Sequence, residues 1–293
     1  MLRIGRITYA NCSPIFHELQ KQAPAEDYQF IGGVPSHLNA LLAAGEIDVC
    51  PSSSIEYALH PERYLILPEL SISSIGAVGS VLLFSRIPME ELDGQTILLT
   101  SESATSVNLL RILLKKRFGC SCGFTVSALP LDSALQEAPA MLLIGDSALR
   151  SSLLDTDLLV CDLGELWYEW TGLPFVFALW LCRRKVARDR YAEVNRLARH
   201  LVASKERACA DLESIAYSAS EAQWMGRDRL VAYWRDNISY DLDSRHLDGL
   251  MLFYRYCVEL GLLPDEPELH FLVSITGELH ELLNKNHREN LKE

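Results

Sequence analysis

The amino-acid sequence predicts an α/β protein of two lobes, with the second lobe inserted into the first and a helical region at the C-terminal end. Three observations favour this fold. Short apolar runs alternate with helical patterns through residues 1–185, which is typical of mainly parallel sheets covered by helices on both faces. Two longer apolar runs, at 79–86 and 172–183, bracket a self-contained strand–helix unit, so we interpret them as strands that cross between the lobes. From about residue 187 onward, only helical spacing is found.

The expected domain boundaries follow the two longer apolar runs. We expect lobe 1 to combine residues 1–88 with 180–293, and lobe 2, the inserted α/β lobe, to span 89–179. A chain of 293 residues with 49% hydrophobic content is long enough for two domains, each with its own core. Two lobes joined by crossing strands leave a cleft, and ligands of open α/β sheets bind beyond the carboxyl ends of strands. We therefore expect the ligand site in this cleft.

The first lobe is expected to open with strand–helix units. The pattern predicts a strand, two helices and a second strand over 3–10, 13–22, 36–45 and 46–50. Pro14 suits a first helical turn, Ser36 suits an N-cap, and Gly45 suits the residue that ends a helix. The second strand leads directly into a serine-rich turn.

The inserted lobe is expected to continue this alternation. The pattern predicts a strand at 95–100 and a helix that begins at 105. Two further strand–helix segments are expected at 141–150 and 156–170. Three aromatic residues near the end of the lobe, Trp167, Tyr168 and Trp170, are expected to pack inside it rather than to line the cleft.

The C-terminal third is expected to be helical. Apolar residues recur at three- and four-residue spacing in four segments, 188–221, 221–238, 243–263 and 268–285. Some of these helices must pack on lobe 1. The charged end at 285–293 is typical of a solvated tail.

The composition argues against several classes of protein. The formal net charge of −12, with no compensating stripe of Lys and Arg, disfavours a nucleic-acid partner. No segment approaches the roughly 20 apolar residues of a membrane span. The N-terminus also lacks the pattern of a secretory signal, so we expect a cytoplasmic protein without a membrane partner. The eight Cys residues form no C-x-x-C pair and no zinc-ligand spacing, and we expect neither a metal nor an organic cofactor.

One turn between a strand and a helix is unusually rich in hydroxyl groups. In this hydroxyl-rich turn, residues 100–106, five of seven side chains carry a hydroxyl, namely Thr100, Ser101, Ser103, Thr105 and Ser106, with Ala104 among them. A single cap would explain one hydroxyl, because Ser and Thr are ordinary N-caps. Free N–H groups at a helix N-terminus, helped by short hydroxyls, bind a carboxylate or phosphate without Arg or Lys. We therefore expect an anion-binding turn.

Polar residues also stand in the other turns that should face the cleft. They are Asn11 with Ser13, Ser52 with Ser53 and Ser54, Gly145 with Asp146 and Ser147, and Gly76 with Gly79 and Ser80. Each turn alone is what any α/β protein needs. Because the carboxyl ends of neighbouring strands share one edge, the turns together predict a small, uncharged and hydroxyl-rich site.

Standard catalytic motifs are absent from the sequence. It contains no G-x-S-x-G elbow, no Walker loop, no G-x-G-x-x-G and no H-E-x-x-H. Only His17 and His37 lie near the expected turns, and both fall inside helical patterns. Asp146 follows a strand directly and suits either a general base or a helix N-cap equally well.

Six segments, which cover most of residues 3–180 in this order, carry a family resemblance: RIGRITYANCSPIF, GVPSHLNALLAAGEIDVCPSSSIEYALHPERY, LSISSIGAVGSVLLFS, LLTSESATSVNLLRILL, LIGDSAL and LGELWYEWTGLPFVFALW. Together they resemble the chorismate dehydratases of the futalosine route to menaquinone. The C-terminal third is similar to that family only in general character. The resemblance implies a two-lobed type II periplasmic-binding-protein-like fold with a helical C-terminal region.

The resemblance also implies an activity, the loss of water from chorismate to give 3-[(1-carboxyvinyl)oxy]benzoate. It implies that Asn11 and Ser80 hold the reacting end and hydrogen-bond the departing hydroxyl. By hypothesis, Ser101, Ser103, Thr105 and Ser106 of the hydroxyl-rich turn bind the ring carboxylate together with their backbone amides, and Ser53 and Ser54 bind the carboxylate of the enolpyruvyl arm. The expected substrate-binding set also includes Ala104, Gly145 and Asp146.

Two questions stay open at the level of sequence. The proton acceptor is either the enolpyruvyl carboxylate of the substrate itself or a protein base, Asp146 or His37. The alternative functions are the sister dihydroxynaphthoate synthase, a non-catalytic carboxylate-binding protein and the sensing domain of a transcriptional regulator. We expect a monomer or a homodimer whose partner is a small molecule.

Overall fold

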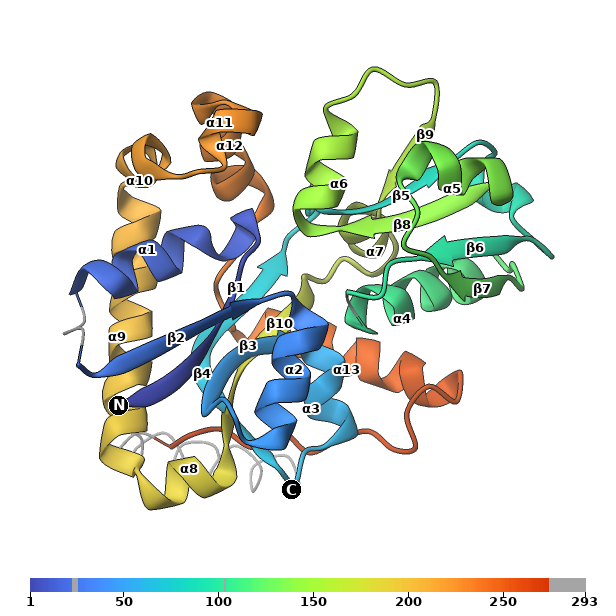
Figure 1. Cartoon of the computed structure of the whole chain (residues 1–293). Coiled ribbons are helices and arrows are strands. Elements are labelled where there is room, and N and C mark those ends of the chain that lie inside the picture. The colour runs from blue at the N-terminus through green and yellow to red at the C-terminus, as the bar shows by residue number, and fades with distance from the viewer. Residues whose placement is uncertain (23–25, 103, 274–293) are drawn as a thin grey trace.

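The computed structural model describes residues 1–22, 26–102 and 104–273 of the chain. Two five-stranded sheets form the cores of two lobes that lie side by side (Figure 1). The strands are β1 (Leu2–Ile7), β2 (Tyr28–Gly33), β3 (Val49–Ser53), β4 (Tyr64–Ser74), β5 (Val81–Ser85), β6 (Thr96–Leu99), β7 (Gly123–Val126), β8 (Ala140–Ile144), β9 (Leu159–Asp162) and β10 (Phe175–Arg183). The predicted α/β class is confirmed.

The two sheets share one design. The first has the strand order β2-β1-β3-β10-β4, and the second has the order β7-β6-β8-β5-β9. Within each sheet one strand runs antiparallel to both of its neighbours: β10 between β3 and β4, and β5 between β8 and β9. Each of these strands follows a passage of the chain from the other lobe, so the two passages tie the sheets together.

The passages between the lobes overlap only the first residues of the apolar runs that the sequence suggested. Residues 75–80 lead from β4 into β5, and 172–174 lead from the second lobe into β10. Strand β5 (Val81–Ser85) therefore belongs to the second sheet, although the sequence-based boundary at residue 88 placed it in lobe 1. Strand β10 (Phe175–Arg183) belongs to the first sheet, although the boundary at residue 179 placed its first half in lobe 2. Both strands are mostly apolar because they are buried within their sheets, except for Ser85 at the end of β5 and Arg183 at the end of β10.

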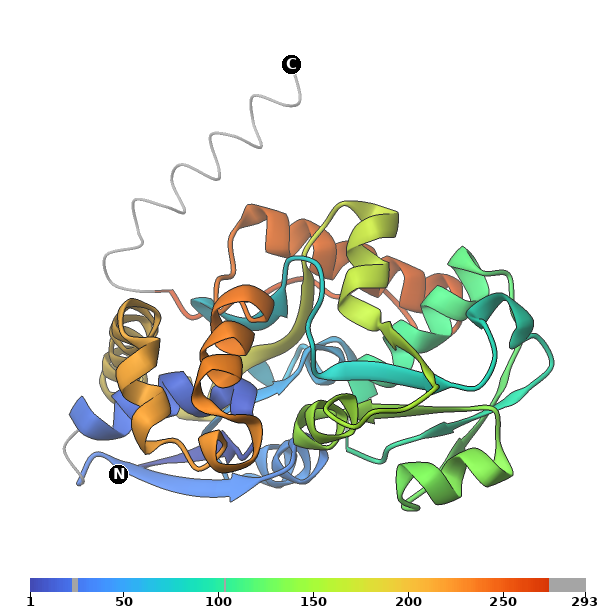
Figure 2. The same cartoon turned by 90° about the horizontal axis from the view of Figure 1, so that it is seen from above.

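Helices cover the sheets and build the C-terminal region. They are α1 (Ser13–Gln22), α2 (Pro35–Ala44), α3 (Ser54–Leu59), α4 (Ala104–Ile112), α5 (Leu131–Glu137), α6 (Gly145–Ser152), α7 (Leu163–Thr171), α8 (Arg184–Asp189), α9 (Tyr191–Ala210), α10 (Leu212–Ser218), α11 (Ala222–Met225), α12 (Arg227–Ala232) and α13 (Ser244–Glu259). Two π-helical turns, η3 (Leu113–Arg117) and η4 (Tyr233–Asn237), extend α4 and α12. Helix α9 packs along α1, and the segment with α12 lies beside the passage into β5 (Figure 2).

Three sequence-based expectations about local structure are wrong. Helix α2 begins at Pro35 with Val34 as its N-cap, so Ser36 lies inside the first turn; the fixed φ of proline suits that first position. Strand β3 occupies Val49–Ser53 rather than 46–50; Asp48 lies just before it, and its carboxylate accepts the backbone N–H of Arg3 and forms an ion pair with the Arg3 guanidinium. Gly45 does end α2, with a left-handed φ of 83°.

The third correction concerns the end of the chain. The described part of the segment 268–285 is not helical, since His270 and Leu272 exchange backbone hydrogen bonds with Ile66 on β4. Its remainder, and the tail at 285–293, lie outside the described residues.

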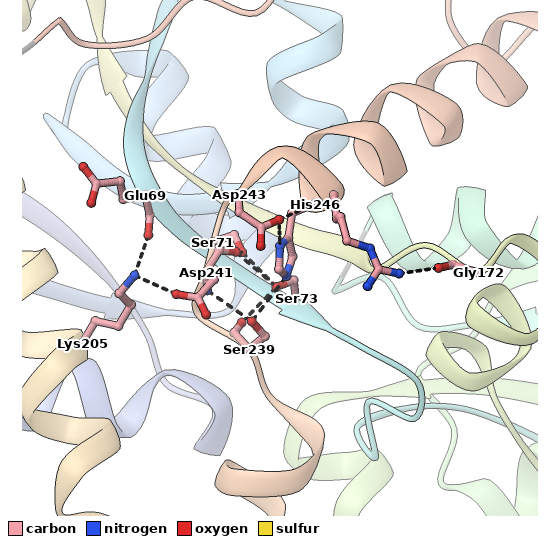
Figure 3. A network of polar contacts seen from close by, with 10 residues as sticks. Glu69, Ser71, Ser73, Gly172, Lys205, Ser239, Asp241, Asp243 and His246 are labelled. Atoms are coloured by element: carbon pink, nitrogen blue, oxygen red, sulfur yellow. Dashed lines mark hydrogen bonds and ion pairs between the residues drawn. The ribbon is translucent and has the colours of Figure 1, made fainter. Parts of the chain in front are cut away.

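A polar network fastens the C-terminal region to the edge of β4 (Figure 3). Ser239 pairs with Ser73 on β4, and Lys205 on α9 joins Asp241 to the same edge. Buried His246 contacts Ser239 at 3.4 Å and a carboxylate that also caps α13. These contacts fix the segment between η4 and α13 against the first sheet.

The passage from β4 to β5 is held from the second lobe. The carboxylate of Asp162 accepts hydrogen bonds from the backbone N–H groups of Val78 and Gly79, at 3.0 and 2.6 Å, while it also caps α7. Burial raises the pKa of this carboxyl group, against these hydrogen bonds. The backbone just before Ser80 is therefore fixed.

Candidate active site

A small cavity lies between the two lobes, at the carboxyl ends of the strands. Its volume is about 50 Å³. It is lined by Ile7, Tyr9, Asn11, Cys12, Pro35, Ser53, Ile72, Val78, Ser80, Val81, Ser106, Ile144, Gly145, Phe177 and Ala178. No Lys, Arg, His, Asp or Glu is among these described lining residues. Any charge on a ligand here must be balanced by dipoles and hydrogen bonds.

Five predicted site residues meet in this cavity. Asn11, Ser53, Ser80, Ser106 and Gly145 all line it, although they come from five separate stretches of the chain. Their turns follow or precede strands of both sheets. The expectation of one polar site between the lobes therefore agrees with their positions.

Asn11 offers an acceptor to a ligand. Its side-chain Oδ1 is buried and has no hydrogen-bond partner among the described residues. Its backbone oxygen, in contrast, accepts a hydrogen bond from the hydroxyl of Tyr240 at 2.8 Å. Because an unpaired buried acceptor is costly, Oδ1 is best explained as a contact for a ligand donor.

Ser80 is held from both sides of the cleft. Its backbone oxygen accepts the N–H of Gly145 at 2.8 Å, which joins the passage to the start of α6. Ser80 is only 1% exposed, and its hydroxyl accepts a hydrogen bond from the hydroxyl of Tyr233 at 2.8 Å. The N–H of Gly145 is therefore used within the protein and is not free for a ligand.

The hydroxyl-rich turn contributes its last two members to the site. Ser106 is buried and lines the cavity, whereas the hydroxyl of Thr105 lies 3.3 Å from that of Ser54 and accepts the N–H of Ile55 at 3.2 Å. Thr105 thus joins the N-terminus of α4 to that of α3. Ser53, Ser54, Thr105 and Ser106 thus gather at the end of β3 and at the starts of α3 and α4, and we call these four residues the hydroxyl patch.

The earlier members of the turn lie differently. Ser101 and Ala104 are exposed and are not among the residues that line the cavity. Ser103 lies outside the described residues. Glu102 turns toward the first lobe, where its carboxylate accepts the hydroxyl of Tyr9 at 2.7 Å.

The lobes are closed on each other. Besides the Tyr9–Glu102 bond, the carboxylate of Asp146 accepts the N–H of Ala10 at 2.9 Å across the cleft. Gly145 has a φ of 59°, and a Cβ there would lie 2.7 Å from the ring of Tyr9. Ligand pockets usually enclose about 300 Å³ or more. A ligand can enter this cavity only after these contacts separate.

The two candidate protein bases do not face the cavity. Asp146 is outside the lining, and its carboxylate is engaged with Ala10. Burial raises the pKa of Asp146, and the Ala10 hydrogen bond opposes this shift. His37 is exposed on α2. The titratable lining residues are Tyr9 and Cys12, and burial raises the pKa of both, which keeps them neutral near pH 7.

The two tryptophans at the end of the inserted lobe lie outside the cavity lining, as predicted, but they pack against β10 and α13 rather than inside that lobe. Trp167 is fully buried and contacts Phe175, with ring centroids 5.2 Å apart. Trp170 stacks on Tyr256 of α13 at 5.2 Å. They join α7 to the C-terminal region and do not line the cavity.

Two residues of η4 that support the site were not predicted from the sequence. Tyr233 contacts Ser80, and the indole N–H of Trp234 donates to the backbone oxygen of Ala10 at 2.7 Å. Both side chains are buried. The sequence indicates only that a buried Tyr or Trp needs a hydrogen-bond partner for its polar atom. It does not indicate which partner, because the partners here are more than 150 residues away in the chain.

Comparison with known proteins gives a family match. A family model described as menaquinone biosynthesis matches residues 2–259. A chorismate dehydratase from Thermus thermophilus is 32% identical over 267 residues, which cover 85% of this chain and 93% of that protein. A chorismate dehydratase from Campylobacter jejuni is 30% identical over 187 residues, 62% of this chain and 68% of that protein.

Solved structures agree on the fold. A crystal structure of a protein from Archaeoglobus fulgidus has a TM-score of 0.72 at 20% identity and covers 89% of this chain and 98% of its own. The alkanesulfonate-binding protein of Xanthomonas axonopodis, bound to MOPS, has a TM-score of 0.66 at 16% identity and covers 90% and 94%. The chain has a periplasmic-binding-protein-like fold. Within the described residues, no helix is long and apolar enough to cross a bilayer.

Proposed function

Because this chain belongs to the menaquinone-biosynthesis family, we propose that it is a chorismate dehydratase, a lyase that converts chorismate to 3-[(1-carboxyvinyl)oxy]benzoate. The observation that carries the proposal is the 32% identity to a chorismate dehydratase over 85% of the chain. The cavity between the lobes supports it, since it combines an unpaired acceptor, buried hydroxyls and no cationic side chain among its described lining.

The proposed reaction breaks two bonds of the substrate ring. The C3–H bond gives its proton to a base, and the electron pair is conjugated through the ring double bond into the ring carboxylate. The C4–O bond then breaks, the hydroxyl leaves, and with a proton it forms water. The ring becomes aromatic, which makes the overall loss of water favourable. The protein must stabilise the charge that develops on the carboxylate and on the departing oxygen.

The hydroxyl patch is the proposed site for a substrate carboxylate. Ser106 and Ser53 line the cavity, and Ser106 belongs to the first turn of α4, where backbone N–H groups and the helix dipole favour negative charge. Such preorganised donors stabilise developing charge without a counter-ion. Thr105 supports the patch by bonding across the lobes.

The other end of the cavity is the proposed site of bond breaking. The C4 hydroxyl is the one hydroxyl donor that chorismate carries, and it matches the unpaired Oδ1 of Asn11. Ser80 is the proposed hydrogen-bond donor to the same oxygen as it leaves, since both residues line one cavity. Positioning of this kind contributes up to about 7–11 kcal/mol in favourable cases.

We propose that the proton from C3 goes to the enolpyruvyl carboxylate of the substrate. The described cavity lining supports this, since it contains no carboxylate and no imidazole. The rival base is Asp146 or His37. Purified Asp146→Asn and His37→Ala variants are expected to keep turnover within about threefold of the wild type; a loss of about a hundredfold or more in either one would favour a protein base.

The proposed function is tested by incubating the purified protein with chorismate. We expect the cyclohexadiene absorbance to disappear and 3-[(1-carboxyvinyl)oxy]benzoate to form in equal amount. An unchanged spectrum would rule out this activity and would favour the sister synthase or a non-catalytic carboxylate-binding protein. A cytoplasmic location and a monomeric or homodimeric state stay predictions from the sequence.

A further inference from the structure

We propose that Tyr233 is a positioning residue, whose hydroxyl donates to Ser80 and thereby directs the Ser80 proton into the cavity, toward the oxygen that leaves. This inference rests on the proposed dehydration. It extends that proposal to a residue of the C-terminal region, which lies outside the six segments that carry the family resemblance. Its basis is a buried chain of two hydroxyl groups that ends in the cavity.

The contact between the two hydroxyls is short and buried. The Oη of Tyr233 lies 2.8 Å from the Oγ of Ser80, and both residues are at most 5% exposed. Burial raises the pKa of Tyr233 well above its usual value, so the phenol keeps its proton. The phenol can therefore act as donor, and Ser80 as acceptor.

A serine hydroxyl that accepts one bond still has its own proton to donate. The oxygen of Val78, two residues earlier in the chain, lies 3.5 Å from the Ser80 hydroxyl, which is the long limit for such a bond. That weak contact is easily replaced by a better acceptor. Since Ser80 lines the cavity, the leaving oxygen of a bound ligand is such an acceptor.

The position of Tyr233 is built into the passage between the lobes. Gly79 has a φ of 70°, and a Cβ on this residue would lie 3.3 Å from the Tyr233 ring, so the ring packs directly on the glycine. The side chain of Asn237, one turn further along η4, donates to the backbone oxygen of Ala77 at 3.0 Å. These contacts fix the position of Tyr233 relative to the passage that carries Ser80.

This arrangement suits the step that releases hydroxide. As the C4–O bond breaks, negative charge grows on the oxygen, and a hydrogen bond to it strengthens. A donor that itself accepts a hydrogen bond is polarised and becomes a stronger donor. Tyr233 is expected to act in this way on Ser80 and to keep its hydroxyl from rotating away.

The test is a double-mutant cycle with Tyr233→Phe and Ser80→Ala, measured by steady-state turnover of chorismate. For Tyr233→Phe we expect kcat to fall about ten- to a hundredfold while KM changes less than about threefold. For Ser80→Ala we expect a fall of about a hundredfold or more in kcat. The double variant should be no slower than Ser80→Ala alone, because Tyr233 acts through Ser80.

A matched control removes a buried hydroxyl elsewhere. Tyr64 is 1% exposed and its hydroxyl donates to Glu56 at 3.0 Å, outside the cavity lining. Tyr64→Phe is expected to leave kcat unchanged even if it lowers the melting temperature. If Tyr233→Phe alone folds poorly, the double variant, which leaves neither partner of the bond unpaired, still keeps the proposal falsifiable: a double variant slower than Ser80→Ala would show that Tyr233 acts independently of Ser80.

The outcomes separate the two proposals. Wild-type protein that does not turn over chorismate overturns both the proposed function and this role of Tyr233. With an active wild type, a Tyr233→Phe variant of normal kcat overturns the positioning role only. So do losses that multiply in the double variant, because they would show that Tyr233 acts independently of Ser80.

Discussion

The hydroxyl-rich turn (100–106) and the π-helical turn η4 (Tyr233–Asn237) serve the same cavity in opposite ways. The former brings hydroxyl groups to its wall, but its residues range from exposed Ser101 to buried Ser106. The latter contributes none of the described lining residues, yet Tyr233 bonds to Ser80, which lines the cavity, and Trp234 bonds to Ala10 next to Asn11. The contrast teaches that local composition indicates where a ligand is contacted, whereas long-range packing determines how firmly the contacting groups are held.

The largest effect is expected at Asn11, which follows Ala10, the residue that η4 holds through Trp234. Asn11→Ala removes the unpaired Oδ1, and we expect kcat to fall about a hundredfold or more, because the acceptor for the C4 hydroxyl is lost. The melting temperature should change little, since Oδ1 has no partner among the described residues. Chorismate turnover and thermal unfolding measure the two. Normal turnover would remove Asn11 from the site.

The hydroxyl-rich turn is tested by comparing two of its serines. Ser106→Ala is expected to raise KM about tenfold, since a hydrogen bond to a carboxylate is worth about 1.5 kcal/mol or more. Ser101→Ala serves as the matched control, because that side chain is exposed and outside the cavity lining. Initial rates over a range of chorismate concentrations give both values. An equal change of KM in Ser106→Ala and Ser101→Ala would contradict the proposal that the buried Ser106, and not the exposed Ser101, binds the substrate.

The support that η4 gives to the first turn is expected to have a smaller effect on activity. Trp234→Phe leaves the buried oxygen of Ala10 without its donor, which should lower the free energy of unfolding by about 1–3 kcal/mol. We expect kcat to fall only a few-fold, because Ala10 is one residue away from Asn11. Urea unfolding and turnover are measured together. An unchanged unfolding midpoint would contradict the structural importance of this bond.

The smallest effect is expected at the carboxylate that bonds across the lobes. Burial raises the pKa of Asp146 in the folded protein, so the folded state binds more protons than the unfolded state. Its contribution to stability is therefore fully present below the unfolded pKa of about 3.9 and is lost as the pH rises through the raised value. Asp146→Asn removes this dependence. From pH 4 to pH 7, the unfolding free energy of the wild type should therefore fall relative to that of Asp146→Asn. Parallel curves for the two proteins would argue against the raised pKa of Asp146.

Much of the fold could be predicted from the local sequence pattern. Helix α1 occupies 13–22 as expected, and Gly45 ends α2 with the left-handed φ that glycine favours. The start of α2 was missed because Pro35 and Ser36 both suit the first turn, and the proline decided it. The passages between the lobes were assigned to apolar runs, because a strand buried in one sheet and a strand between lobes have the same composition.

The candidate site was predictable only in part. Turns at the ends of strands suggested Asn11 and Ser53, since strand ends converge at one edge of a sheet. Ser80 was suggested by its place at the start of an apolar run that was expected to cross between the lobes. Tyr233 was not predictable, because its partner is 153 residues earlier in the chain and no local pattern encodes that pairing. Polar atoms of buried aromatic residues are a useful place to look for such distant supports.

The tight closure of the lobes has a practical consequence for the discovery of inhibitors. A rigid search that fits compounds into a space of about 50 Å³ would reject the natural substrate along with every useful compound. Compounds that wedge against Tyr9 and keep it apart from Glu102 would instead exploit the opened form. Screening should therefore begin from conformations in which that hydrogen bond is broken.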